Sequence, residues 1–345
     1  MNIKKVVSFI SAIVLALGVS VNTYAFSDMP EGEMGKAMQN AVDNGLIEGI
    51  DDNTIAPDMN ITRAQMATII TRAFRATEKS ENVFNDVNSG AWYADAVSKA
   101  NYMGAFEGDD NNNFNPESNI TFQETYLVLS RVFGFEGYKV DNSFVTVNGV
   151  SDEVLNDFPD KDKLAPWAWD GAKYIVGNGN WTGIDGKLKP TDYITRGEFA
   201  ILMDSIVDVY IDKAGEYKDL GDKMVVVRCG GVVIDGLRTN RGLILTYGID
   251  DYGVEVKNSI VNGALMVLGG IDKTPTEEMV DGKKQLLADD AHIKLSGKFY
   301  DVRVKTPMVY VDASNAEVQY FNGVEGSRVA LNLTIQKLSE VQNEN

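Results

Sequence analysis

The chain has 345 residues, of which 32 are lysine or arginine and 50 are aspartate or glutamate, and its formal net charge is −18 at pH 7. A chain this acidic repels phosphate backbones, which argues against nucleic acid as a partner. Its single cysteine, Cys229, and single histidine, His292, exclude an internal disulfide and do not make a metal site or a catalytic pair. We expect structural roles for both residues, and neither a cofactor nor a metal.

The first 25 residues have the layout of a secretory signal peptide. Lys4 and Lys5 form a short positive region, an apolar run follows from Val6 to Val21, and Thr23-Tyr24-Ala25 offers a small-residue cleavage site. The alternative is a membrane anchor, but the run is short for a bilayer span, which needs about 20 apolar residues. We therefore expect cleavage after Ala25, export of the mature chain, and no transmembrane span within it.

Three segments of the mature chain share one layout. Each begins with Phe-x-Asp, at Phe26, Phe84 and Phe158. Each then reaches a proline that is followed four residues later by an Ile-Thr pair, at Pro57, Pro116 and Pro190. Chance does not keep such a spacing three times, so the chain contains internal repeats.

Each repeat is predicted to form a helix, a loop and a second helix. In the second repeat, apolar residues from Trp92 to Met103 follow helical spacing, Gly104 ends the helix, and another helix starts at Thr121. The loop between them, Gly108 to Asn113, is rich in Gly, Asp and Asn, which raises the alternative of a calcium site. The EF-hand spacing and its terminal Glu are missing, so we interpret the loop as a turn.

A capping box is predicted at the start of each second helix. In this motif a threonine hydroxyl accepts a hydrogen bond from the backbone N–H three residues on, and a Gln or Glu at that position bonds back to the cap. Pairs with this spacing are Thr62 and Gln65, Thr121 and Glu124, and Thr195 and Glu198. Such a cap contributes about 1 kcal/mol, so Glu124 and Glu198 are interpreted as caps rather than as catalytic acids.

Capping does not explain the arginines that follow two of these threonines. Arg63 and Arg196 occupy the first helical position, where a cation faces the positive end of the helix dipole. An anion bound there would be held by backbone N–H groups and a forked guanidinium together. The alternative is a surface arginine paired with a neighbouring carboxylate, and the residues alone leave both interpretations open.

The three repeats from Phe26 to Val207 resemble the S-layer homology family. The resemblance rests on the motifs Phe-x-Asp, Trp, Gly, Phe-x-Pro and Ile-Thr-Arg-Ala-Glu, which follow one another in this order. The resemblance implies an all-α, pseudo-threefold spindle of helix-loop-helix repeats, whose grooves bind a secondary cell-wall polysaccharide. The terminal sugar of that glycan typically carries a pyruvate ketal, and the motif arginine contacts its carboxylate with help from the tryptophan and glycines nearby. The ligand-binding candidates implied here are Arg63, Arg196, Trp92, Trp167, Gly49 and Gly108.

The repeats depart from the family pattern in several places. Met34 stands in the first repeat where the second has Trp92. Phe122 replaces the motif arginine in the second repeat, and Leu188 stands where an aromatic residue is expected in the third. We therefore expect at least one groove to be weakened or silent. Trp92 and Trp167 are also open to a second interpretation, as ordinary helix anchors in the core.

The last third of the chain changes to short β-rich runs. Residues 208–223 are polar and are expected to be a linker, and residues 224–345 are predicted to form an all-β domain. Segments 236–240 and 258–263 resemble successive rungs of a short β-solenoid, whose stacking buries a core that one rung cannot bury. The length leaves room for roughly four to six rungs. A β-sandwich is the alternative, and the polar segment 272–290 is expected as an inserted loop.

An enzyme has to be weighed, because many β-solenoids act on polysaccharides. The paired acids Asp250-Asp251 and Asp289-Asp290 lie in loop-like sequence. Paired carboxylates catalyse only where their environments separate their pKa values. We interpret these four residues as solvated loop charge and expect no catalysis.

The sequence thus predicts a multidomain, secreted protein of the bacterial cell surface that anchors itself non-covalently to the cell wall. Expected partners are the secondary wall polysaccharide, or peptidoglycan-linked glycan, and other surface-layer proteins. A wall-anchored glycan-active enzyme and a self-assembling S-layer subunit are the alternatives. We expect the repeats to fold and bind wall material alone. The expected divisions are 1–25 for the signal peptide, 26–74, 84–135 and 158–207 for the repeats, 208–223 for the linker and 224–345 for the β-rich domain.

Overall fold

The structure, a computed structural model, describes residues 26–81, 84–135, 138–140, 143–145, 150–249, 252–270, 277–280, 283–286, 292–307, 309–324, 327–331 and 337–340. The predicted signal peptide and the acid pairs at 250–251 and 289–290 lie outside these ranges. Within them, no helix is both long and apolar enough to cross a membrane.

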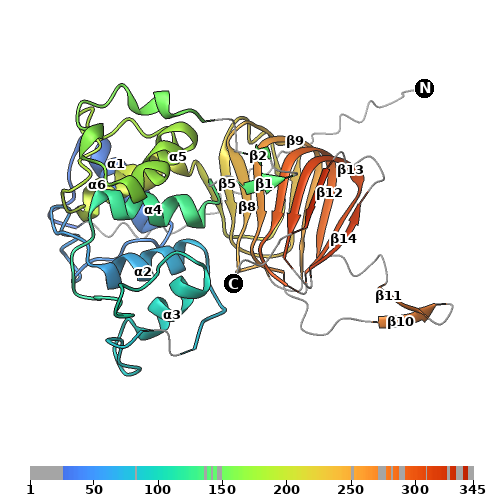
Figure 1. The fold of residues 1–345 in the computed structure, drawn as a ribbon, viewed down its shortest axis with the longest axis horizontal. Coiled ribbons are helices and arrows are strands. Elements are labelled where there is room, and N and C mark those ends of the chain that lie inside the picture. The colour runs from blue at the N-terminus through green and yellow to red at the C-terminus, as the bar shows by residue number, and fades with distance from the viewer. Residues whose placement is uncertain are drawn as a thin grey trace, which may run out of the picture.

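Helices form the N-terminal half of the fold and strands form the C-terminal half (Figure 1). Each repeat contributes two α-helices, as its apolar periodicity predicts. The helices are α1 (Gly32–Asp43), α2 (Arg63–Ala73), α3 (Ala94–Tyr102), α4 (Phe122–Val132), α5 (Trp169–Gly179) and α6 (Arg196–Ile206). A short antiparallel hairpin, β1 (Tyr138–Val140) and β2 (Ser143–Val145), lies between the second and third repeats.

The three repeats are joined at their centre by a closed ring of backbone hydrogen bonds. The N–H of Ile120 donates to the carbonyl of Ile61 at 2.9 Å, that of Ile194 to Ile120 at 3.1 Å, and that of Ile61 to Ile194 at 3.0 Å. All three side chains are at most 1 % exposed. Because every repeat stands in the same relation to the next, the helical half has the pseudo-threefold arrangement that the resemblance implies.

The aspartate of each Phe-x-Asp motif holds the turn that leads toward the second helix. Asp28 accepts hydrogen bonds from the backbone N–H groups of Ile55 and Ala56, both at 2.8 Å. Ala56 has a φ of 53°, in the left-handed region that costs a non-glycine residue about 1–2 kcal/mol. The carboxylate therefore helps to hold a strained backbone. The same aspartates and left-handed residues in the other repeats are Asp86 with Asn115, and Asp160 with Lys189.

The strands of the C-terminal half coil into a parallel β-solenoid of about 5 turns, so the predicted solenoid is confirmed. Consecutive turns pair in parallel and in register, as Met224 with Gly242 and Gly242 with Ala264. The β-sandwich alternative is wrong, because a sandwich is built from antiparallel strands. Inward-facing valine, isoleucine and leucine side chains form the solenoid core.

Strands of the solenoid are β3 (Val209–Ile211), β4 (Gly215–Lys218), β5 (Met224–Val227), β6 (Val232–Asp235), β7 (Arg238–Thr239), β8 (Gly242–Leu245), β9 (Val254–Val267), β12 (Ile293–Val304), β13 (Tyr310–Gly323), β14 (Arg328–Leu331) and β15 (Lys337–Glu340). An antiparallel hairpin, β10 (Glu277–Val280) and β11 (Lys283–Leu286), stands between β9 and β12, in the segment expected as an inserted loop.

Residues 208–223 are not the linker expected from their polar composition. They contain β3 and β4, which pair in parallel with β5 and β6 and form the first turn of the solenoid. Ile211 is 1 % exposed and belongs to the solenoid core. The segment is polar because a terminal turn has a neighbouring turn on one side only, so more of its side chains face solvent.

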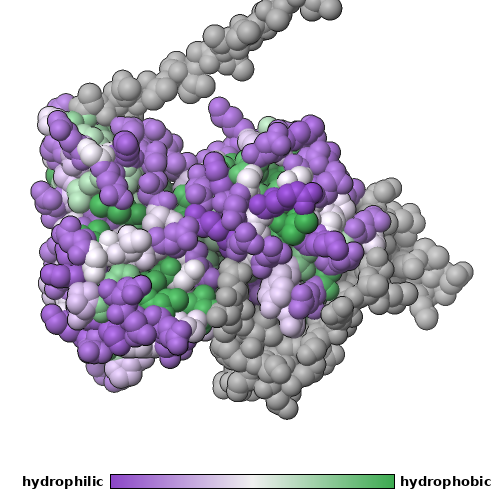
Figure 2. Space-filling view, turned by 90° about the horizontal axis from the view of Figure 1, so that it is seen from above, coloured by the Kyte–Doolittle hydropathy of each residue, from purple (hydrophilic) through white to green (hydrophobic). Residues whose placement is uncertain are grey.

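The helical repeats and the solenoid share a hydrophobic core. One face of the solenoid turns Val226, Ile244 and Met266 toward the helices, and these side chains, at most 2 % exposed, join the helical core. A Cβ on Gly134, just after α4, would lie 2.5 Å from the sulfur of Met266. Figure 2 shows the two halves in contact, with a mostly hydrophilic surface around them. This packing argues against the expected independence of the repeats.

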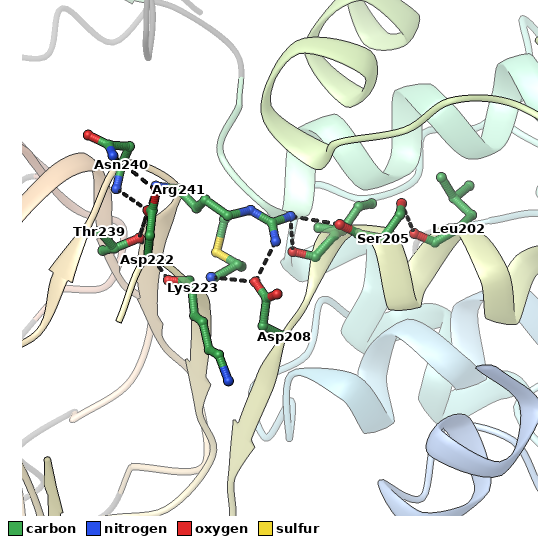
Figure 3. Close-up of polar contacts among 10 residues, drawn as sticks. Leu202, Ser205, Asp208, Asp222, Lys223, Thr239, Asn240 and Arg241 are labelled. Atoms are coloured by element: carbon green, nitrogen blue, oxygen red, sulfur yellow. Dashed lines mark hydrogen bonds and ion pairs between the residues drawn. The ribbon is translucent and has the colours of Figure 1, made fainter. Parts of the chain in front are cut away.

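Polar contacts of Arg241, the residue before β8, reinforce the interface (Figure 3). The guanidinium donates to the carbonyls of Ser205 at 2.7 Å and Ile206 at 2.9 Å, which are end carbonyls of α6. It also pairs with Asp208, whose carboxylate accepts the N–H of Met224 at 2.8 Å. The arginine therefore supplies donors that the end of a helix lacks.

A second arginine, Arg303 of β12, is 3 % exposed in the same interface. It donates to the carbonyl of Gly134 at 2.6 Å and pairs with Asp301, which is fully buried, at 2.7 Å. Removing one partner of such a pair leaves an uncompensated buried charge. The contact therefore ties β12 to the end of α4.

Candidate functional site

Capping boxes form at the start of α2, α4 and α6, each with the predicted threonine and the predicted Gln or Glu. The next backbone N–H groups are bonded across the repeat boundary. The N–H of Arg63 donates to the carbonyl of Ser118 at 2.9 Å, and that of Ala64 donates to Pro116 at 3.0 Å. The starts of α4 and α6 are bonded in the same way. These N–H groups are therefore occupied, which argues against the interpretation in which they hold an anion together with the arginine.

Arg196 fills the boundary between the third and first repeats. Its Nε donates to the carbonyl of Ile55 at 2.8 Å, and its Nη2 donates to the carbonyl of Glu48 at 2.5 Å. The residue is 7 % exposed. Burial lowers the pKa of the guanidinium, and nearby Asp28 opposes this shift. Arg196 thus satisfies two backbone carbonyls of the first repeat and joins the two repeats.

Arg63 stands in the equivalent place between the first and second repeats. Its Nε donates to the carbonyl of Phe114 at 2.7 Å, and its guanidinium carbon lies 5.0 Å from the centre of that ring. Its Nη1 pairs with Glu124 at 3.4 Å, with 16 % of the arginine side chain exposed. Both motif arginines therefore have a structural role between repeats, and their contact with a ligand stays a prediction.

The third boundary, where Phe122 replaces the arginine, is closed by other residues. Phe122 is fully buried, and Tyr126, one helical turn later, donates its hydroxyl to the carbonyl of Leu188 at 2.6 Å. At the other two boundaries, the equivalent carbonyls, those of Phe114 and Ile55, accept hydrogen bonds from Arg63 and Arg196. Lys189 pairs with Glu198 at 2.7 Å and restores the missing cation. The tyrosine four residues after Phe122 was the available sequence signal for this replacement.

The two candidate glycines lie under the phenylalanines that open the repeats. A Cβ on Gly49 would lie 2.6 Å from the ring of Phe26, and one on Gly108 would lie 3.1 Å from the ring of Phe84. Glycine is therefore required, or strongly favoured, by packing at both positions. Ligand contact by Gly49 and Gly108 stays a prediction.

Both candidate tryptophans are on the surface. Trp92, before α3, is 65 % exposed, and Trp167, in the short helix Pro166–Ala168, is 52 % exposed. The alternative that they anchor helices in the core is therefore wrong. A large apolar ring left in water at an equivalent place in two repeats is available to pack on a ligand.

Trp92 lines a groove of about 710 Å³ between α2 and α3. Arg72 and Arg75 line it from the α2 side and Lys99 from α3, and the groove ends against the solenoid. Its basic lining residues are Arg72, Arg75, Lys99 and Arg228, and its acidic ones are Asp95 and Asp212. The groove thus carries a local excess of positive charge in a chain whose net charge is −18.

Arg72, Arg75 and Lys99 are held in ion pairs that are partly open to solvent, whereas Arg228 is buried. Lys99 pairs with Asp95 at 2.7 Å, and Arg75 pairs with Asp212 at 3.2 Å. The hydrogen bond from Lys99 is the main cause that lowers the pKa of Asp95. Pairs this exposed contribute about 0–1 kcal/mol. An incoming carboxylate therefore competes for these cations at little cost.

A pseudo-threefold unit of helical repeats, packed against a β-solenoid and carrying a basic, tryptophan-lined groove, is the class of structure that these observations define. The model of the S-layer homology domain matches residues 25–67, 83–125 and 157–200. The chain therefore carries three S-layer homology domains, and it is a secreted protein of the cell surface or wall.

Curated relatives include surface-layer proteins and enzymes. Surface-layer 125 kDa protein of Lysinibacillus sphaericus is 29% identical over 77% of this chain and 23% of its own length. Surface layer protein of Brevibacillus choshinensis is 31% identical over 39% of this chain and 13% of its own. Exoglucanase XynX of Acetivibrio thermocellus is 26% identical over 55% of this chain and 17% of its own. The chain spans less than a quarter of the length of each of these relatives.

Proposed function

We propose that the protein holds itself non-covalently to the bacterial cell wall by binding an anionic secondary wall polysaccharide in the groove between α2 and α3. The observation that carries this proposal is the exposed Trp92 beside Arg72, Arg75 and Lys99. An aromatic face packs against the apolar face of a sugar ring. A guanidinium takes a carboxylate in a forked geometry.

The anionic group that fits these cations is a carboxylate on the terminal sugar, such as a pyruvate ketal. The net charge of −18 repels a polyanion at long range, so binding needs a local positive site. The groove supplies one, and the solvent-exposed guanidinium of Arg75 is available to a carboxylate. Trp167, Arg63, Arg196, Gly49 and Gly108 remain candidates for contacts in the other grooves.

The role that we propose for the solenoid is not catalytic. The match to the Lysinibacillus sphaericus surface-layer protein covers 77% of this chain, which is more than the span from residue 25 to residue 200. The matches to the exoglucanase and to the amylopullulanase of Thermoanaerobacterium thermosulfurigenes cover 55% and 53%, close to the share of that span. This difference supports a surface-layer role, with other surface-layer proteins as further partners.

The test compares Trp92→Ala with Tyr193→Ala in sedimentation isotherms with purified wall. Both residues are exposed aromatics of the helical half, but Tyr193 does not line the groove. We expect Trp92→Ala to weaken binding about ten-fold or more, as loss of a central aromatic contact does, and Tyr193→Ala to bind as the wild type does. Chemical removal of ketal-linked pyruvate from the wall should weaken wild-type binding. Equal binding by both variants would place the ligand elsewhere.

A further inference from the structure

The groove between α2 and α3 is closed at one end by the solenoid. Asp212 directly follows β3, Cys229 is the second residue after β5, and Gly248 lies in the turn after β8. All three line the groove. Since β3, β5 and β8 are neighbours in parallel register, their following turns stack on one another. The end wall of the groove is therefore built from three successive turns of the solenoid.

This end wall is fixed to the helices by a buried arginine. The side chain of Arg228 is 1 % exposed and pairs with Asp212. Its Nη1 donates to the carbonyl of Asn44 at 2.8 Å, just after α1, and its guanidinium carbon lies 4.5 Å from the centre of the Tyr210 ring. The position of Asp212 relative to the helices is therefore set by charge and hydrogen bonding together.

The same wall positions a cation of the groove. Arg75, whose side chain is 54 % exposed, pairs with Asp212 at 3.2 Å. A Cβ on Gly248 would lie 2.7 Å from the Cβ of Arg75, so glycine lets the stem of Arg75 rest on the solenoid turn. One end of the Arg75 side chain is thus held by Asp212, and its stem lies against Gly248.

We propose that the glycan-binding groove is a composite of the helical repeats and the solenoid, in which the solenoid end wall limits the groove and, through Asp212, positions Arg75 for the anionic end of the wall glycan. This inference rests on the proposed function and goes beyond it, because it gives the solenoid a part in recognition. Asp212 acts as a positioning residue for Arg75. Cys229 lies in the same wall, so the reactivity of its thiol should change when that end of the groove is occupied.

Alkylation of Cys229, the single cysteine of the chain, tests the proposal on the mature chain without mutation. The rate of reaction with a maleimide is measured with and without fragments of the secondary wall polysaccharide at saturating concentration. We expect the bound fragment to slow alkylation ten-fold or more. Cys229→Phe, which adds bulk at a residue that lines the end of the groove, should weaken fragment binding ten-fold or more, whereas Cys229→Ala should bind as the wild type does.

The outcomes separate the two proposals. Fragment binding that depends on Trp92 but leaves both the alkylation rate and the affinity of Cys229→Phe unchanged would overturn the composite groove and keep the wall-binding function. No fragment binding by the wild type would overturn both. If Cys229→Phe fails to fold, as its melting curve would show, the alkylation rates of the wild type decide.

Discussion

At the scale of single residues, the neighbours of an arginine decide its role more than its place in a motif. Arg63 and Arg196 stand where a helix dipole disfavours a cation, which points to a function outside the helix. In the folded chain, both arginines donate hydrogen bonds to backbone carbonyls of the neighbouring repeat. Tyr126 takes over the same carbonyl contact where Phe122 stands. The common requirement is a donor at each repeat boundary.

We expect Arg196→Ala to lower the free energy of unfolding by about 2–4 kcal/mol, because two carbonyls shielded from solvent lose their donors. Thr195→Ala should cost about 1 kcal/mol through loss of the cap. Arg72→Ala is the control, since Arg72 forms an exposed pair with Glu48 and its loss should cost no more than about 0.5 kcal/mol. Denaturant unfolding of the three variants checks this. An Arg196→Ala variant as stable as the wild type would contradict the structural role.

At the scale of the elements, each turn before a second helix depends on one carboxylate. The Asp of Phe-x-Asp accepts two consecutive backbone N–H groups, of which the second belongs to a residue with left-handed backbone. Because the repeats differ in that residue, which is Ala56, Asn115 or Lys189, the conformation is imposed by the aspartate and not by a glycine. This turn also positions the backbone carbonyls that accept hydrogen bonds from Arg63, Tyr126 and Arg196 at the repeat boundaries.

This arrangement predicts a pH dependence for Asp28. The hydrogen bond from the N–H of Ile55, with that from Ala56, holds the pKa of the carboxyl below its usual 3.8, against the raising effect of burial. A lowered pKa in the folded state means that the ionised group stabilises the fold above pH 3.8, and that this contribution is lost as the pH falls through the folded value. Asp28→Asn should therefore lower the melting temperature at pH 7, and the difference from wild type should shrink below pH 3.8.

Asp58→Asn, a change at an exposed aspartate near the same turn, is the control for this series. Thermal melts of the two variants and the wild type at several pH values check the prediction. A difference between Asp28→Asn and wild type that stays constant from neutral to acid pH would show that the charge of Asp28 contributes nothing.

At the scale of the whole molecule, the solenoid is packed as part of the helical core and not tethered beside it. Apolar residues of four neighbouring strands face the helices, and Arg228, Arg241 and Arg303 bond to the ends of three helical segments. An interface with a hydrophobic centre and buried polar anchors holds two parts in one arrangement. This explains how a groove on the repeats can have a wall made by the solenoid.

We expect the mature chain to unfold in one cooperative transition, because its halves share a core. In calorimetry, the calorimetric and van't Hoff enthalpies should agree, and helical and β signals in circular dichroism should be lost together. Met266→Lys, at the centre of the interface, should lower stability by about 3 kcal/mol or more. Lys298→Ala, at an exposed solenoid position, should change it by no more than about 0.5 kcal/mol. Two separated transitions in the wild type would contradict the shared core.

The sequence by itself determined the features that depend on local spacing. Repeat number, helix starts, capping boxes and parallel rungs all follow from periodicity and from residue types at fixed offsets, so the helical repeats and the solenoid were both predictable. The loop turn of Asp109 was also predictable, since its carboxylate accepts the N–H groups of Asn111 and Asn113, both at 2.9 Å. These interactions span few residues, and short stretches of sequence contain both partners.

Only the tertiary structure decided which side chains are exposed in a groove and which face another repeat. Arg196 meets carbonyls 141 and 148 residues away, and Arg228 meets one 184 residues away. No local sequence pattern contains both partners of such a contact. From sequence alone, the arginines were therefore candidates for ligand binding, and residues 208–223 were predicted to be a linker. The exposure of Trp92 and the solenoid wall of its groove depend in the same way on how distant segments pack, because burial is a property of the folded chain and not of the residue.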